Sequence, residues 1–251
     1  MKRIFAFVYQ ISIWLPIFFI ITILTALTTT IGCLCGGEKI FAYYPGMIWS
    51  RLVCMLSLCP VKVVGHEKLN KKQSYIFVAN HQGAFDIFLL YGYLRQPIKW
   101  MMKQSLRNIP LIGKACESAG FIFVDNSSPK AALRSIDEAK KRLVNGNSVI
   151  IFPEGSRTKT GKLAPFKKGA YQLALDLKLP IVPLSINGSY EVMPIHSYLL
   201  SPHKIVLTIH DPIDTSPFVS EDVRQLTSNI RTLLSQSKDA IESGLWDKYK
   251  S

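Results

Sequence analysis

Acidic residues are scarce in this 251-residue sequence, which has 17 Asp and Glu against 30 Lys and Arg and a formal net charge of +13. Charge of either sign is missing from residues 4 to 37. The composition is 48% hydrophobic, which predicts a folded chain without extensive disorder. Positive charge combined with long apolar runs is typical of proteins that contact an anionic surface, either membrane headgroups or nucleic acid.

The uncharged run favours the membrane over nucleic acid. About twenty apolar residues are enough to cross the hydrocarbon core of a bilayer, and this run is longer. Lys2 and Arg3 precede it, and the positive-inside tendency then keeps the N-terminus cytoplasmic. A cleaved signal peptide would have a shorter apolar core and a small-residue cleavage site, which this sequence lacks.

A second apolar stretch covers residues 40–61 and contains Arg51 and Trp49. Such residues favour a helix at the membrane interface over one that crosses fully. We therefore predict that residues 1–62 form a membrane-associated helical hairpin that embeds from one side, with two full crossings as the alternative. Both arrangements leave the remaining chain, 63–251, on the cytoplasmic face of the membrane. In a bacterium this membrane would be the inner membrane.

The five cysteines include no C-x-x-C pair, and four of them lie in or beside the apolar stretches. This pattern predicts a reducing compartment and no metal site. The sequence also lacks a G-x-S-x-G turn, which removes the usual serine nucleophile of a lipid hydrolase.

Residues 63–251 alternate between short apolar runs and helical patterns, with no internal repeat. Nearly continuous Val, Ile and Phe runs are typical of strands covered on both faces, so we predict an α/β domain with a mostly parallel sheet flanked by helices. The expected strands are 75–79, 121–124, 148–152, 181–186 and 205–209, and the expected helices are 86–94, 110–119, 128–143, 168–177 and a terminal helix from residue 221.

His81 and Asp86 follow the first of these strands. Residues five apart on one helix are separated by about 140° and would not meet well. They can meet if His81 lies in the loop and Asp86 in the first helical turn, and Gly83 supplies the break between them. Held by the carboxylate through one ring nitrogen, the imidazole could take a proton from a hydroxyl group with the other. A structural role for the pair is the alternative.

The sequence FPEGSRT at residues 152–158 follows another strand and so lies at a carboxyl end, where α/β sheets usually bind ligands. Arg157 can hold a phosphate through two parallel hydrogen bonds, and Gly155 allows a close backbone approach. The spacing is wrong for a nucleotide P-loop. A phosphate-bearing ligand is the preferred interpretation, and a solvated basic turn is the alternative. Further lysines follow at positions 159, 162, 167 and 168.

Four segments in this order resemble the motifs of the glycerolipid acyltransferases. Residues 80–86 resemble their N-H-x4-D box, residues 120–125 their G-x-x-F-I-D segment, residues 152–158 their F-P-E-G-[ST]-R-[ST] box, and residues 180–184 their block containing V-P. The resemblance extends from about residue 75 to residue 189. Each motif alone is weak, whereas four in sequence are highly specific.

The resemblance implies transfer of an acyl group from an acyl thioester, either acyl-CoA or an acyl-carrier protein, to the free hydroxyl of 1-acylglycerol-3-phosphate. It implies that His81 is the base and that Asp86 orients it. The residues implied to position the substrates are Glu154, Gly155, Ser156 and Arg157 for the acceptor, Gly120 and Asp125 in the same cleft, Pro183 near the donor, and the less specific Lys103 and Lys167.

The implied partners are the lipid bilayer, lysophosphatidic acid and the acyl donor, with no metal, no cofactor and no nucleic acid. One departure concerns Asn126, since the family often has Arg directly after the aspartate of the second box. The acceptor could therefore be glycerol-3-phosphate or another lyso-lipid. A non-catalytic membrane protein that binds phospholipid headgroups is the alternative from a different class, and it would have no need of a base.

Overall fold

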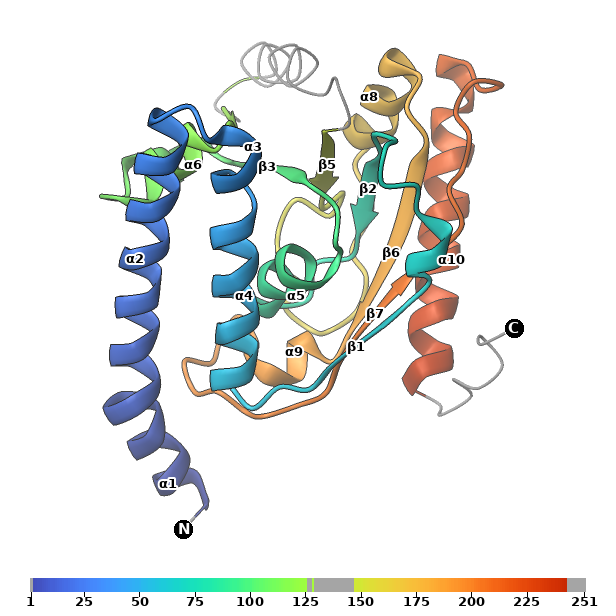
Figure 1. The fold of residues 1–251 in the computed structure, drawn as a ribbon. Coiled ribbons are helices and arrows are strands. Elements are labelled where there is room, and N and C mark those ends of the chain that lie inside the picture. Colours follow the sequence, from blue (N-terminus) through green and yellow to red (C-terminus); the bar gives the residue numbers. More distant parts are fainter. Residues whose placement is uncertain (1, 126–127, 129–146, 243–251) are drawn as a thin grey trace.

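A sheet with helices on both faces forms the centre of the computed structural model, which describes residues 2–125, 128 and 147–242 (Figure 1). Within these residues the sheet has seven strands in the order β1-β7-β6-β2-β5-β3-β4. Their bounds are β1 Val61–Val64, β2 Ile76–Ala79, β3 Ile98–Lys103, β4 Ile122–Val124, β5 Ser148–Ile151, β6 Ile181–Asn187 and β7 Ile205–Ile209.

The sheet is mostly parallel, as the sequence predicts. Strands β6, β2, β5, β3 and β4 pair in parallel. Strand β7 is antiparallel to β6, and β1 follows the direction of β7. The sequence analysis did not predict β1 and β3, each of which has a lysine at its second position, Lys62 and Lys99. The Lys99 side chain is buried, and its ammonium donates a hydrogen bond to the carbonyl of Ala119 at 2.6 Å. Strand β3 therefore contains a charged residue that interrupts the apolar pattern by which a strand is predicted.

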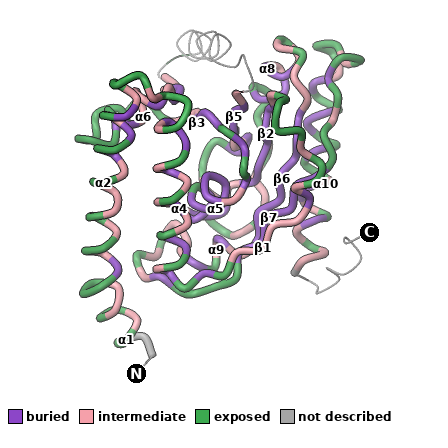
Figure 2. The backbone as a smooth tube through the Cα atoms, in the orientation of Figure 1, coloured by how far each residue is buried: buried purple, intermediate pink, exposed green. Residues whose placement is uncertain are grey.

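Alternate residues of β2 enter different cores because successive side chains of a strand point to opposite faces. Ile76 and Val78 pack with α8 and α10, while Phe77 and Ala79 pack with α4 and α5. All of β2 is buried, in agreement with the near-continuous apolar pattern of a strand covered on both sides (Figure 2).

Helices of the α/β domain lie on both faces of the sheet, α5 on one and α8 and α10 on the other (Figure 1). The predicted helices at 86–94, 110–119, 168–177 and from 221 are present with slightly different ends. The prediction at 128–143 falls, apart from Ser128, outside the described residues. The bounds are α5 Phe85–Tyr93, α6 Ile112–Ser118, α8 Gly169–Leu177, α9 Ser189–Val192 and α10 Val223–Glu242, with 3-10 turns η2 His66–Lys68, η3 Gln104–Asn108 and η4 Ser220–Asp222.

The N-terminal region contains a long helix followed by two shorter ones. Helix α1 (Lys2–Tyr9) continues through a π-helical turn, η1 (Gln10–Trp14), into α2 (Leu15–Leu34), and α3 (Glu38–Phe41) and α4 (Tyr44–Leu56) follow. Among the described residues, Ile4–Leu34 is the single helix that is long and apolar enough to cross a membrane. Helix α4 has 13 residues and is about 20 Å long, which is too short for a hydrocarbon core of about 30 Å.

Hydrogen bonds between aromatic and hydroxyl side chains join the two N-terminal helices. Trp14 Nε1 donates to Ser57 Oγ at 2.8 Å, and Trp49 Nε1 donates to Thr22 Oγ1 at 2.9 Å. Helix α4 also packs directly on α5, the helix that carries Asp86. The N-terminal pair is therefore connected to the α/β domain by packing. Strand β1 begins at Val61, close to the predicted division between residues 62 and 63, and the division itself stays a prediction.

His210, which follows β7, gives folding a predictable pH dependence. Its Nε2 lies 2.8 Å from the hydroxyl of Ser185, and burial, with a smaller effect of Lys68, lowers its pKa from 6.5 to about 4. Because the folded pKa lies below the unfolded one, the unfolded chain binds the proton more tightly. We expect the free energy of unfolding to be highest above pH 6.5 and to fall by up to about 3 kcal/mol as the pH decreases toward 4.

Thermal unfolding of the detergent-solubilised protein at a series of pH values would measure this effect. The matched variant is His210→Asn, whose amide can still form a hydrogen bond with Ser185 but does not titrate. We expect a weaker dependence on pH for this variant over the same range. Identical pH dependence in both proteins would show that His210 does not cause it.

Candidate active site

Three loops meet at the carboxyl ends of β6, β2 and β5, which are neighbours in the sheet. Residues 80–84 follow β2, residues 152–158 follow β5, and residues 187–189 lie at the end of β6. Loops at the carboxyl ends of parallel strands are the usual position of a ligand site in an α/β sheet. The structure therefore brings the two main sequence motifs, separated by more than 70 residues, to one edge of the sheet.

His81 and Asp86 are in contact. Nδ1 of His81 lies 2.7 Å from Oδ2 of Asp86, with His81 in the loop and Asp86 in the first turn of α5, as the sequence requires for the pair to meet. The carboxylate accepts the hydrogen of Nδ1, so the lone pair of the imidazole lies on Nε2. Because the His81 side chain is 15% exposed and the Asp86 side chain is fully buried, the accessible part of the pair is the imidazole.

Asp86 is held by further donors. Its Oδ2 also accepts the backbone N–H groups of Gln82 at 2.6 Å and Gly83 at 3.0 Å, and its Oδ1 accepts the hydroxyl of Ser189. These donors compensate for the burial of a charge that would otherwise be costly. Gly83 is needed here because a Cβ at this position would lie 2.6 Å from the carbonyl oxygen of Ser189. The carboxylate is thereby fixed before any substrate binds.

Sequence reasoning did not identify Ser189 or the structural role of Asn80. Asn80 exchanges two hydrogen bonds with the backbone of Ile186, at 2.7 and 2.8 Å, and so joins the loop after β2 to β6. Ser189 follows Gly188, which has a positive φ of 88° and ends β6 with a sharp turn. The Gly-Ser pair after a predicted strand was the available signal, and it indicates a turn without indicating its partner.

Glu154 connects the two motifs through backbone contacts. Its Oε1 accepts the N–H of His81 at 2.7 Å, and its Oε2 accepts the N–H of Ala164 at 2.8 Å. The backbone N–H of Thr158 in turn donates to the carbonyl of His81 at 2.9 Å. Burial raises the pKa of Glu154 above its ordinary value, against the lowering effect of the N–H groups of His81 and Ala164. Glu154 therefore positions the His81 loop from its buried location.

The imidazole of His81 stacks on the ring of Phe152, with centroids 3.9 Å apart and planes inclined by 13°. Trp100 extends the aromatic surface, with its ring 6.3 Å from that of Phe152. This packing on one face and the Asp86 hydrogen bond on one edge together fix the orientation of the imidazole.

A cavity of about 890 Å³ begins at His81 and extends toward the N-terminal helices. Its polar end is formed by His81 with Gly155 and Lys167, and Lys103 also belongs to its wall. Most of the remaining wall is apolar and comes from α2, α4, β3, η3 and α6, with Phe18, Phe19, Ile23, Trp49, Leu111 and Ile112 among its residues. An imidazole and ammonium groups in the wall of a mostly apolar cavity match a ligand that has both a charged head and an apolar tail.

Gly155 permits a close contact with Lys167. Its φ of 77° lies in the left-handed region, and a Cβ at this position would lie 2.7 Å from Nζ of Lys167. Ser156 is exposed, and Arg157 is half-buried two residues after Gly155. Within the described residues, no acidic side chain forms an ion pair with Arg157.

The other predicted residues, like Ser156 and Arg157, do not line the cavity. Gly120 ends α6 with a φ of 73°, and its neighbours Ala119 and Phe121 line the cavity. Asp125 is half-buried directly after β4, and Asn126 lies outside the described residues. Pro183 is buried inside β6, where it pairs with Val78. The roles of these residues stay predictions.

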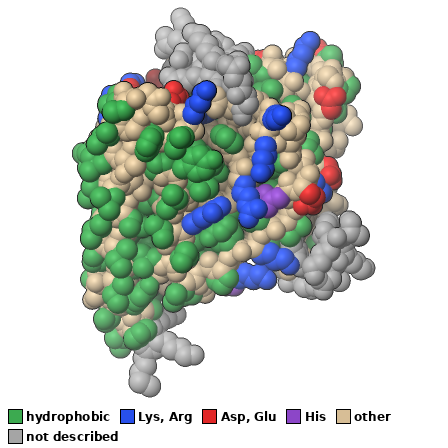
Figure 3. All heavy atoms as spheres, in the orientation of Figure 1, with side chains coloured by type: hydrophobic (Ala, Val, Ile, Leu, Met, Phe, Trp, Pro, Cys, Tyr) green, Lys and Arg blue, Asp and Glu red, His purple; other side chains and the backbone are tan. Residues whose placement is uncertain are grey.

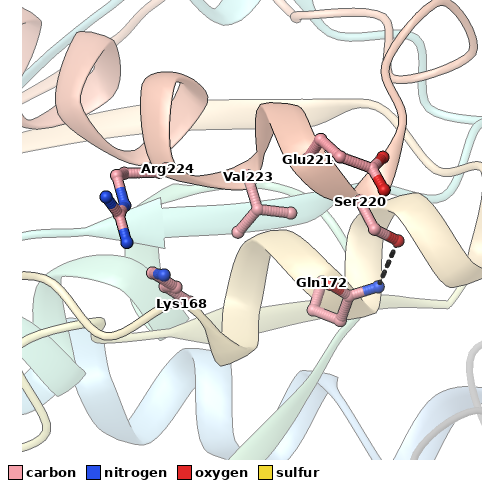
Figure 4. Close-up of a pocket in the computed structure, with 6 residues that line it drawn as sticks. All are labelled: Lys168, Gln172, Ser220, Glu221, Val223 and Arg224. Carbon is pink, nitrogen blue, oxygen red and sulfur yellow. Dashed lines mark hydrogen bonds between the residues drawn. The ribbon is translucent and has the colours of Figure 1, made fainter.

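A smaller hollow of about 530 Å³ lies between α8 and the start of α10 (Figure 4). Lys168 and Arg224 lie at one end, and Gln172 Nε2 donates to Ser220 Oγ at 3.5 Å at the other. None of its lining residues lines the cavity at His81. Adjacent lysines therefore serve different surfaces, Lys167 in the cavity and Lys168 in this hollow.

The family model named Acyltransferase matches residues 60–187. Among curated proteins, the 1-acyl-sn-glycerol-3-phosphate acyltransferase of Cocos nucifera is 33% identical over 189 residues, which are 75% of this chain and 61% of that protein. The protein of the same name from Limnanthes douglasii is 30% identical over 82% of this chain and 73% of its own length. The one from Saccharomyces cerevisiae is 32% identical, covering 79% and 66%.

Among solved structures, the crystal structure of the 1-acyl-sn-glycerophosphate (LPA) acyltransferase from Thermotoga maritima has a TM-score of 0.82 and 25% sequence identity. The match covers 96% of this chain and 98% of that one. The likeness therefore includes the N-terminal helices as well as the sheet, and it supports the predicted fold class.

Proposed function

Because the chain belongs to the acyltransferase family, we propose that it transfers a fatty acyl group from an acyl thioester to the free hydroxyl of 1-acylglycerol-3-phosphate, giving phosphatidic acid. The contact between His81 Nδ1 and Asp86 Oδ2 at 2.7 Å, at the polar end of the cavity, carries this proposal. The names of the relatives support the choice of acceptor.

The proposed chemistry uses His81 as a general base. Its Nε2 takes the proton of the acceptor hydroxyl while the oxygen attacks the carbonyl carbon of the thioester. The C–S bond then breaks, and the imidazolium returns the proton to the leaving sulfur. Asp86 stabilises the imidazolium through Nδ1–H and does not itself take the proton. A thioester is already activated, so the proposed route needs no covalent enzyme intermediate, metal or cofactor.

The phosphate of the acceptor is proposed to lie near Arg157, with Lys103 and Lys167 contributing at the mouth of the polar region. Arg157 is the residue best suited to a phosphate because its guanidinium presents two parallel N–H groups. Lys167 lies directly over Gly155 and can reach the same region. The distance between the phosphate and the hydroxyl of the acceptor then sets where the reacting oxygen lies relative to His81.

The long N-terminal helix is proposed to embed in the bilayer, with the site on its cytoplasmic side. The lysophosphatidic acid tail can then remain in the lipid while its phosphate and hydroxyl reach His81. The helix Ile4–Leu34 has the hydropathy for this placement, and Lys2 and Arg3 before it favour a cytoplasmic N-terminus. Embedding from one side, without a full crossing, keeps the site on that same face. The net charge of +13 favours contact with anionic lipid.

Purified full-length protein incubated with acyl-CoA and lysophosphatidic acid would test the proposed activity. We expect phosphatidic acid to form faster than lysophosphatidic acid forms from glycerol-3-phosphate. Replacing acyl-CoA with acylated carrier protein in the same assay identifies the preferred donor. Turnover of glycerol-3-phosphate or of a lyso-lipid without a free phosphate, with no turnover of lysophosphatidic acid, would refute the proposed acceptor. Binding without any turnover would favour the non-catalytic alternative.

Arg157→Ala is expected to raise the KM for lysophosphatidic acid about 10- to 100-fold with little change in kcat. This range corresponds to the loss of charge-assisted hydrogen bonds worth about 1.5–3 kcal/mol. The dependence of the rate on acceptor concentration at saturating donor measures it. Arg157→Lys, which keeps the charge and loses the planar fork, is expected to be intermediate.

Arg224→Ala is the matched control, since Arg224 is exposed and lines the separate hollow between α8 and α10. We expect its KM to equal that of the unchanged protein. An unaltered KM in Arg157→Ala would remove Arg157 from the phosphate site and leave that role to the lysines.

A further inference from the structure

Apolar side chains are also exposed on a part of the α/β domain that lies outside the N-terminal helices. They belong to residues 106–112, here called the 106–112 segment, which runs from the second half of η3 to the first residue of α6. Leu106, Ile109, Leu111 and Ile112 are between 38% and 47% exposed. Single exposed apolar residues are normal, whereas four within seven positions form a patch that requires an explanation.

The backbone of this segment keeps the apolar side chains on the surface. Leu111 has a φ of 63°, which is uncommon for a bulky residue other than glycine. Hydrogen bonds hold this conformation, from Gly113 N to Ile109 O at 2.8 Å and from Ala115 N to Leu111 O at 2.9 Å. Gly113 also lies so close to the carbonyl of Arg107 that a side chain would not fit. The segment is therefore fixed in a conformation that leaves the side chain of Leu111 exposed.

The segment is continuous with the apolar surface of the long N-terminal helix. Helices α2 and α6 pack directly against each other, and they lie side by side in Figure 1. Exposed side chains of α2, among them Phe19 and Ile23, line the same cavity as Leu111 and Ile112. In Figure 3 hydrophobic side chains gather over the part of the face where α2 and α4 lie, and Lys and Arg side chains border them.

The charges around the segment match an anionic lipid surface. Three basic residues, Lys103, Arg107 and Lys114, flank the apolar side chains. One acidic residue, Glu117, forms ion pairs with Arg107 and Lys114. Leucine and isoleucine between long cationic side chains are typical of segments that dip into the headgroup and upper acyl region of a membrane.

From these observations we propose that the 106–112 segment inserts into the bilayer as a second membrane contact, separate from the N-terminal helix. The proposal rests on the membrane placement given under the proposed function. All four apolar residues of the segment, like several residues of α2, are both exposed and part of the cavity wall. With both elements in lipid, an acyl chain passes from the bilayer to the cavity without crossing water.

Photolabelling of the full-length protein in vesicles tests this contact. The vesicles contain phosphatidylcholine, phosphatidylglycerol and a small fraction of phospholipid with a diazirine in its acyl tail, and mass spectrometry locates the label after digestion with trypsin. Cleavage after Arg107 and Lys114 releases residues 108–114 as one peptide. We expect label in this peptide and in residues 4–34, and none at Val219, an exposed apolar residue near η4.

A double variant, Ile109→Asp with Leu111→Asp, provides the matched comparison. We expect the label in the peptide at 108–114 to fall several-fold while the label in residues 4–34 is retained, with the circular dichroism spectrum unchanged. Label in residues 4–34 and none at 108–114 in the unchanged protein would overturn the second contact alone. Absence of label from residues 4–34 would overturn the membrane placement itself. Equal labelling of Val219 and residues 108–114 would also overturn the proposal, because it would indicate nonspecific contact with lipid.

Discussion

His81→Ala is expected to lower kcat for acyl transfer by about 100- to 10,000-fold, the usual contribution of a positioned general base. The imidazole has its Nδ1 committed to Asp86 at 2.7 Å and lines the cavity, so the variant loses the base that this geometry prepares. A rate assay with lysophosphatidic acid at saturating donor measures the effect, and protein recovered in membranes shows that folding and membrane association are retained.

His81→Asn distinguishes the role of His81 as a base from its role as a hydrogen-bond donor to Asp86. The amide of asparagine can donate to Asp86 as Nδ1 does, but it cannot take a proton from an alcohol. We expect this variant to be as inactive as His81→Ala while being the more stable of the two. His196→Ala, at an exposed position, is the control and should retain full activity. Full activity in His81→Asn would refute the proposed base.

Asp86→Asn is expected to lower kcat by at least about 100-fold. If the amide oxygen of the new side chain faces His81, Gln82 and Gly83, the tautomer of His81 is kept but the imidazolium loses its counter-charge. If the amide nitrogen faces them, it opposes two backbone N–H groups and forces the proton to Nε2. In either orientation the imidazole is a weaker base, although the volume of the side chain is unchanged.

The pH dependence of kcat distinguishes loss of the base from loss of folding in this variant. Asp239→Asn, an exposed position on α10, is the control for a change of the same residue type. Because Asp86 is fully buried, unfolding of the Asp86→Asn protein by heat should also be followed, and we expect a decrease of about 1–3 kcal/mol in stability for each hydrogen bond left unmade. Unchanged kcat together with unchanged stability would contradict the role assigned to Asp86.

Local patterns were sufficient for the central part of the site. The contact of His81 with Asp86 depends on a turn of five residues, and Gly83 and the apolar run after it indicate where loop becomes helix. The position of Gly155 after β5 likewise follows from a single strand and its turn. Both motifs lie next to their strands, so the parallel sheet predicted from the apolar runs already places them at the same edge.

Contacts between distant parts of the chain could not be predicted in this way. Asn80 bonds to Ile186, and Ser189 bonds to Asp86, over more than 100 residues. Asparagine and serine are also common in turns, so the residue types of Asn80 and Ser189 do not indicate these distant partners. The strand β3 was missed because Lys99 interrupts its apolar pattern, and only the folded structure shows the Ala119 carbonyl that satisfies this buried lysine. The cavity is also invisible in the sequence, because helices from both the N-terminal region and the α/β domain form its wall.

Phe152 lies flat against the imidazole of His81 and closes one face of the ring. A base that deprotonates an alcohol can also deprotonate water, and the product would then be a free fatty acid. The stacked ring keeps water from that face of the imidazole and fixes the plane in which the lone pair of Nε2 lies. We expect a smaller side chain at residue 152 to loosen the imidazole and to raise the release of fatty acid relative to ester formation.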